Sequence, residues 1–128
     1  MKITSFNPMI VTKDLESVVA IFEALGFEKR HNPIGTSAVG NEYTSYRMTD
    51  QNGFHVDVST TAAPMKQDLT GIRMNVDDFE EAYDFLIARG FNNGQNGTVT
   101  DTGSAKACIL FSPSGFAINV IQHIRNHD

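Results

Sequence analysis

The sequence DLESVVAIFEALGF at residues 14–27 recurs as DFEEAYDFLIARGF at residues 78–91. In both copies an Asp opens the stretch, apolar residues follow at helical spacing, and Gly-Phe closes it. An acidic residue suits the positive end of a helix, and Gly is a frequent C-terminal stop. Each copy is therefore predicted to form one amphipathic helix.

The repeat extends beyond the helices, because GFHVDV at residues 53–58 matches GFAINV at residues 115–120. A period near sixty is too long for a solenoid unit and indicates one supersecondary module used twice. Strands are predicted around both helices, at residues 3–11, 27–32, 42–49 and 53–59 in the first half. In the second half a first strand carries Gly71, Arg73 and Asn75, and others follow near 91–98, 104–112 and 116–124. The last two strands of each half read as a β-hairpin.

The predicted fold class is α+β, with two tandem β-α-β-β-β modules that form curved mixed sheets. Helices are expected on the outer face of these sheets and a cup on the inner face. The modules cover residues 1–60 and 68–128, joined by a linker at 61–67, and together they make a single domain over residues 1–128.

The amino-acid composition argues against several classes of function. The 128 residues carry a net charge of −5 without a basic cluster, so nucleic acid and anionic membranes are not expected partners. The single cysteine, Cys108, lies in an apolar run and is expected to be a buried, unreactive thiol. No stretch resembles a signal peptide or a membrane span, which favours a cytoplasmic location.

The duplicated module, with VTKDLE at residues 11–16, LGF at 25–27 and SPSGF at 112–116, resembles the vicinal oxygen chelate superfamily. That superfamily includes glyoxalase I, bleomycin-resistance proteins and extradiol dioxygenases. The resemblance covers essentially the whole chain and implies a homodimer. It implies little about activity, since this fold hosts many functions.

The resemblance also implies where a metal ion would bind, at two positions in each module. Carried onto this sequence, the four positions hold Asn7, Asp57, Gly71 and Asn119. Glycine offers no side chain, and neutral amides are poor ligands for transition metals. The sequence therefore predicts no metal and no cofactor. A replacement site built from His55, Asp57 and His123 is the alternative.

Strand alternation predicts which residues line the cup. Phe54, Val56 and Val58 should pack against a helix, as should Phe116, Ile118 and Val120. The opposite face then supplies a mixture of polar and apolar groups that suits a small organic ligand. The candidate ligand-binding residues are Asn7, Met9, His55, Asp57, Arg73 and Asn119.

Arg73 has two interpretations that the sequence supports equally. Its guanidinium can clamp a carboxylate or phosphate of a ligand, or it can neutralise Asp57 in a buried pair. Arg47 and Tyr43 share one face of their strand, but which face depends on the register of the hairpin.

Three functions remain open. The first is a protein that binds a small organic ligand in a metal-free cup. The second is a divalent-metal-dependent lyase or dioxygenase of the same superfamily with an atypical metal site. The third is metal-free acid–base catalysis by His55, oriented by Asp57.

Overall fold

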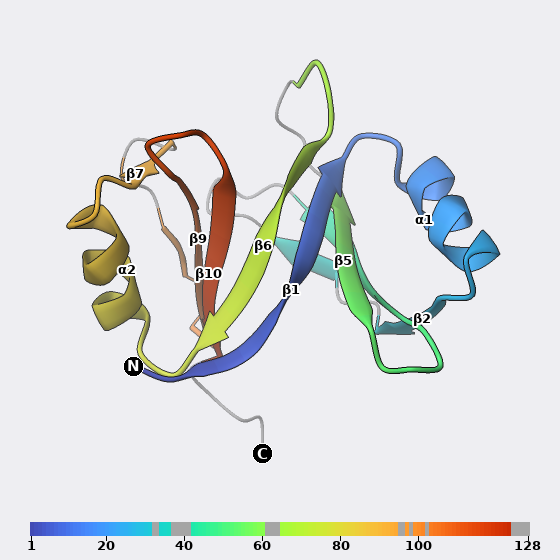
Figure 1. Ribbon diagram of the computed structural model, residues 1–128, viewed down its shortest axis with the longest axis horizontal. Helices are drawn as coiled ribbons and strands as arrows, with labels where there is room; N and C mark the ends of the chain where they lie inside the picture. Colours follow the sequence, from blue (N-terminus) through green and yellow to red (C-terminus); the bar gives the residue numbers. More distant parts are fainter. Residues whose placement is uncertain are drawn as a thin grey trace. The chain divides into compact units, whose positions relative to one another are not determined.

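The computed structural model describes residues 1–31, 34–36, 42–60, 65–94, 97, 99–101 and 103–123. The chain divides into two compact units (Figure 1). The N-terminal unit is Asn7–Thr70, and the C-terminal unit is Met1–Phe6 together with Gly71–Asp128. No helix among the described residues is both long and apolar enough to cross a membrane.

The N-terminal unit is a mixed sheet with one helix, α1 (Leu15–Ala24). Its strand order is β2 (Glu28–His31), β4 (Glu42–Thr49), β5 (His55–Thr60) and β1 (Ile3–Thr12), and a short β3 (Ile34–Thr36) also pairs with β4. Strands β1 and β5 are parallel, and β4 is antiparallel to both β5 and β2.

The C-terminal unit repeats this topology around α2 (Phe79–Ile87). Its strand order is β6 (Leu69–Val76), β10 (Ala117–His123), β9 (Ala105–Phe111) and β7 (Asn92–Asn93), and β8 (Thr100–Asp101) also pairs with β9. Strands β6 and β10 are parallel and β9 and β10 antiparallel. The prediction of an α+β fold with a duplicated βαβββ module is confirmed.

Both helices begin and end as the repeat predicts. Asp14 and Asp78 are N-caps, and each side chain accepts a hydrogen bond from the backbone N–H three residues later. At the other end Gly26 and Gly90 have φ of +103° and +96°, a conformation that favours glycine. The following Phe27 N–H reaches back to the Phe22 carbonyl at 2.9 Å, and the C-terminal unit repeats this bond.

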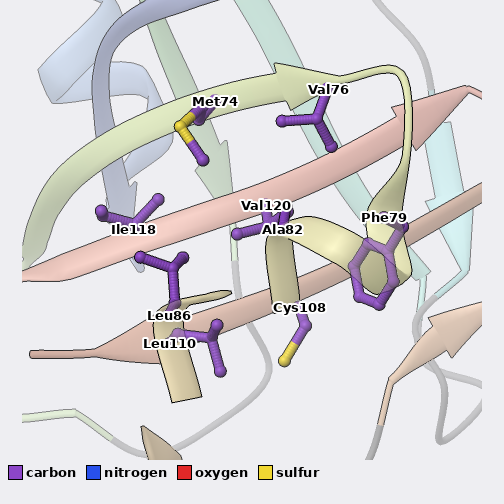
Figure 2. Packing of buried hydrophobic residues seen from close by; sticks show 9 residues of the cluster. All are labelled: Met74, Val76, Phe79, Ala82, Leu86, Cys108, Leu110, Ile118 and Val120. Carbon is purple, nitrogen blue, oxygen red and sulfur yellow. The ribbon is translucent and has the colours of Figure 1, made fainter. Parts of the chain in front are cut away.

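Each helix packs on one face of the sheet of its own unit. In the C-terminal unit, side chains from β6, β9 and β10 meet those of α2 (Figure 2), namely Met74, Val76, Phe79, Ala82, Leu86, Cys108, Leu110, Ile118 and Val120. In the N-terminal unit the corresponding apolar cluster has Val19, Met48, Val56 and Val58 as its buried members. The opposite surface of each sheet is called the helix-free face below.

Two expected core residues lie at the surface instead. Phe54 is 65% exposed and Phe116 is 50% exposed. Each stands one position before its strand begins, because β5 starts at His55 and β10 at Ala117. Strand alternation therefore does not apply to them.

The N-terminal hexapeptide belongs to the C-terminal unit. Its Lys2 N–H donates to the Asp77 carboxylate at 2.6 Å, and the Lys2 carbonyl accepts from the Asp77 N–H at 3.1 Å. The predicted modules begin at residues 1 and 68, whereas the compact units divide inside β1, between Phe6 and Asn7.

Candidate functional site

Three polar pairs face each other across β4 and β5 on the helix-free face of the N-terminal unit. The apolar residues between them, such as Met48 and Val56, point to α1. The three directly opposed pairs are Ser45 with Ser59, Arg47 with Asp57, and Thr49 with His55. These six residues are called the polar row below.

Asp57 is the most buried residue of the polar row, with 2% of its surface exposed. The Arg47 guanidinium donates from Nε to Oδ1 at 3.1 Å and from Nη2 to Oδ2 at 3.3 Å. Asn7 Nδ2 donates to Oδ2 at 2.8 Å. A buried carboxylate is costly unless it is paired and hydrogen-bonded, and these contacts meet both needs.

Strand β1 brings the predicted residues Asn7 and Met9 to the same place. Met9 is the register partner of Asp57 and is 2% exposed. Asn7 lies two residues earlier on the same face and is 6% exposed. The parallel pairing of β1 with β5 therefore unites three of the six predicted ligand-binding residues.

His55 has a hydroxyl partner. Its Nδ1 lies 2.8 Å from Thr49 Oγ1, the residue directly opposite. The acid–base hypothesis requires Asp57 to orient the imidazole, and the described hydrogen bond comes from Thr49 instead. This geometry gives the acid–base mechanism no support.

The predicted residues Arg73 and Asn119 come together in the C-terminal unit. They are register partners on the parallel strands β6 and β10. Arg73 Nε donates to Asn75 Oδ1 at 3.2 Å, which steadies the guanidinium on the helix-free face. Small and aliphatic residues of this unit share that face by strand alternation, among them Ala107, Ile109 and Ile121.

Comparison with known proteins places the fold. No model of a protein family matches the sequence, and no protein of curated function matches it. Solved structures do match. A glyoxalase/bleomycin resistance/dioxygenase superfamily member from Vibrio splendidus superposes with a TM-score of 0.58 at 15% identity, covering 94% of this chain and 99% of the other.

Two enzymes superpose as well. Methylmalonyl-CoA epimerase from Mycobacterium tuberculosis gives a TM-score of 0.66 at 11% identity, with 96% of this chain and 90% of that chain covered. A mutant of glyoxalase I from Zea mays gives 0.63 at 14% identity, with 98% of this chain but only 45% of that chain covered. The chain has the vicinal oxygen chelate fold. At these identities the likeness concerns the fold alone.

The resemblance described in the sequence analysis puts one implied metal position at residue 71, where the structure leaves no room for a side chain. A Cβ built on Gly71 would lie 2.6 Å from the carbonyl oxygen of Ala117 and 3.0 Å from its Cβ. The obstacle is backbone of the paired strand β10, so it cannot rotate away. A ligating side chain at residue 71 would require the two strands to separate.

Asn7 and Asp57, two of the other implied positions, do not suit a divalent cation in the arrangement observed. Asp57 already accepts three described hydrogen bonds, and Asn7 turns its Nδ2 donor, not its oxygen, toward the carboxylate. A divalent cation 4 Å from the Arg47 charge would be repelled by roughly 8 kcal/mol at an effective dielectric constant near 20. A cation could therefore bind Asp57 only after Arg47 had moved away.

The alternative metal site would draw His55 and Asp57 from the N-terminal unit and His123 from the C-terminal unit. Within the described part of the chain, no three His, Cys, Asp or Glu side chains gather closely enough to hold a metal ion. His127 lies outside the described residues.

Arg47 is the site residue that the sequence analysis left unassigned. The hairpin places it on the face of Asp57 because the Asp50 N–H donates to the Phe54 carbonyl and fixes the turn. Counting back from that closing pair sets Arg47 opposite Asp57. The turn sequence DQNG at residues 50–53 carries this signal. Tyr43 lies on the same strand, but the structure describes only its backbone.

Cys108 takes no part in either face described above. It is 3% exposed within the core of the C-terminal unit. Burial raises the pKa of its thiol to about 11. At neutral pH the thiol is therefore protonated, which confirms the prediction of a buried thiol and removes it as a nucleophile.

Proposed function

We propose that the protein binds a small organic ligand without a metal ion, on the helix-free faces of its two units. The observation that carries this proposal is the state of Asp57, the one carboxylate at a metal position of the fold. Arg47 supplies the positive charge beside it and Asn7 the further hydrogen bond. Because the Arg47 guanidinium balances the charge of Asp57, this site can accept a ligand through hydrogen bonds and apolar contact.

The two faces suggest the character of the ligand. The polar row of the N-terminal unit offers hydroxyl, imidazole and guanidinium groups. The face of the C-terminal unit offers Arg73, Asn75 and Asn119 among aliphatic neighbours. A molecule with an apolar body and a polar or anionic group matches both. The proposed contact residues are Asn7, Met9, Arg47, His55, Asp57, Arg73 and Asn119.

Arg73 retains both of its proposed roles. Its Nε bond to Asn75 holds the guanidinium in a fixed orientation, as a ligand clamp requires. Arg73→Gln, used in the screen below, tests the first of these roles.

The alternative is a divalent-metal-dependent lyase or dioxygenase of the superfamily with an atypical metal site. The glyoxalase I and dioxygenase descriptions of similar structures favour it. It requires Arg47 to leave Asp57 and a metal to be held without a side chain at residue 71.

A homodimer and a cytoplasmic location also belong to the proposal. Light scattering of the purified protein tests whether it is a dimer.

A thermal-shift screen of small organic acids, amides and aromatic compounds tests ligand binding, with every well containing EDTA. The proposal predicts that at least one compound class raises the melting temperature in EDTA, since a ligand that binds only the folded state stabilises it. Arg73→Gln should reduce the shift, and Lys2→Gln, a change of an exposed lysine whose backbone bonds to Asp77, should not. Shifts that appear only when Mn²⁺ or Zn²⁺ replaces EDTA would support the metal-dependent alternative.

A further inference from the structure

The polar row of the N-terminal unit has more hydrogen-bond donors than its internal bonds consume. Ser59 Oγ donates to Ser45 Oγ at 3.0 Å, which leaves the Ser45 hydroxyl hydrogen unused within the row. Thr49 and His55 share one hydrogen bond at 2.8 Å. A neutral imidazole and a hydroxyl carry two hydrogens between them, so either tautomer leaves one to donate elsewhere.

Arg47 contributes the largest surplus. A guanidinium has five N–H donors, and the described bonds to Asp57 use Nε–H and one hydrogen on Nη2. The Nη1 edge has no hydrogen-bond partner among the described residues. With 28% of its side chain exposed, Arg47 is accessible from the helix-free face.

Asp57 fixes the orientation of this edge. Nε and Nη2 grip the carboxylate side-on, so the fork between Nη1 and Nη2 is directed away from it. A held guanidinium loses little conformational entropy when a second planar group binds, which is the usual advantage of arginine over lysine. The one acidic side chain of the row thereby orients the cation and has its own oxygens engaged.

The residues that carry the surplus donors lie in a row along the paired strands β4 and β5. Residues 45, 47 and 49 alternate along β4 opposite 59, 57 and 55 along β5, so the row spans about 13 Å at the usual strand rise. No buried side-chain nitrogen or oxygen among the described residues lacks a partner. Arg47 Nη1, which has no described partner, is therefore a group that solvent or a ligand can reach, whereas Ser45 and Thr49 are buried.

We propose that the polar row binds the carboxylate of a small organic acid, with the Nη1 edge of Arg47 as its anchor and His55 beside it. This inference rests on the proposed metal-free function and names the ligand class for it. A carboxylate matches because it accepts hydrogen bonds only, is planar, and pairs with an arginine fork in bidentate fashion.

Isothermal titration calorimetry in EDTA tests this with sodium acetate, succinate and glutarate as probes and succinamide as the uncharged match. A carboxylate should bind and succinamide should not, at constant ionic strength. Arg47→Lys should weaken binding by about ten- to a hundredfold, the usual loss for one hydrogen bond to a charged group. Lysine retains a cation beside Asp57, so this variant should remain folded, and its thermal unfolding checks that.

Lys29→Gln is the matched control. It removes one positive charge from the N-terminal unit, which Arg47→Lys does not, so it tests whether net charge alone affects binding. However, Lys29 is the register partner of Met48, on the helix-covered side, and its ammonium lies 4.9 Å from the centre of the Tyr46 ring. Its binding should equal that of the wild type.

The outcomes separate the two proposals. Carboxylate binding in EDTA that survives Arg47→Lys would overturn the anchoring role and leave metal-free binding intact. No binding of any probe, with or without metal, would overturn the carboxylate assignment. Binding that requires Mn²⁺ in place of EDTA would overturn the metal-free function itself.

Discussion

Arg47→Gln should lower the free energy of unfolding by about 3 kcal/mol at neutral pH, because it removes one partner of an ion pair whose carboxylate is buried. Asp57 is 2% exposed, so water cannot solvate it in place of the guanidinium. Asn7 would still donate to Oδ2, but a neutral amide does not replace the guanidinium charge. Urea denaturation followed by circular dichroism measures the loss.

A double-mutant cycle isolates the pair. Arg47→Gln combined with Asp57→Asn should cost at least about 1.5 kcal/mol less than the sum of the single changes, since no charge remains buried. Lys106→Gln serves as the control. It breaks the exposed pair between Lys106 and Glu80 at 3.0 Å, and its effect should be close to zero. Additive losses at residues 47 and 57 would show that Arg47 does not stabilise Asp57.

Gly71→Ala should cost about 2–3 kcal/mol, the range for an extra group forced into a packed interior. Its Cβ would lie 2.6 Å from the Ala117 carbonyl oxygen, and neither strand can relieve this contact without disturbing the β6–β10 ladder. The same denaturation measurement applies. A stability equal to that of the wild type would mean that residue 71 is open to side chains, and the closed metal position would be disproved.

Two further variants show whether backbone is the obstacle. Gly94→Ala would place a Cβ 2.9 Å from the ring of Phe111, a side chain that can turn aside, so it should cost clearly less than Gly71→Ala. Adding Ala117→Gly to Gly71→Ala removes the contact with the Ala117 Cβ but not the one with the carbonyl oxygen. The double variant should therefore recover only part of the loss.

Local sequence signals were sufficient to predict the helices and strands of the fold. The Asp14 and Asp78 caps and the Gly26 and Gly90 stops depend on residues within a few positions of one another, so they can be read directly. Strand alternation likewise placed Asp57 opposite the helix-facing Val56. The repeat then transferred each prediction from one half to the other.

The register of paired strands and the close contact between two strands were harder to predict, because both depend on a second strand. Arg47 could be assigned to Asp57 only through the closing pair of the β4–β5 turn. The tight contact of Gly71 with Ala117 depends on two strands far apart in the sequence. The same limit affected Phe54 and Phe116, whose exposure depends on where each strand begins.

Metal content and metal affinity test the central proposal most directly. The purified, untagged protein is examined by elemental analysis and then titrated calorimetrically with Mn²⁺, Fe²⁺, Ni²⁺ and Zn²⁺, beside Asp57→Ala. With Arg47 neutralising Asp57 and residue 71 closed, we predict no stoichiometric metal and no difference between the two proteins. Stoichiometric binding at micromolar or tighter affinity that disappears in Asp57→Ala would contradict the metal-free site and favour an enzyme of the chelate type.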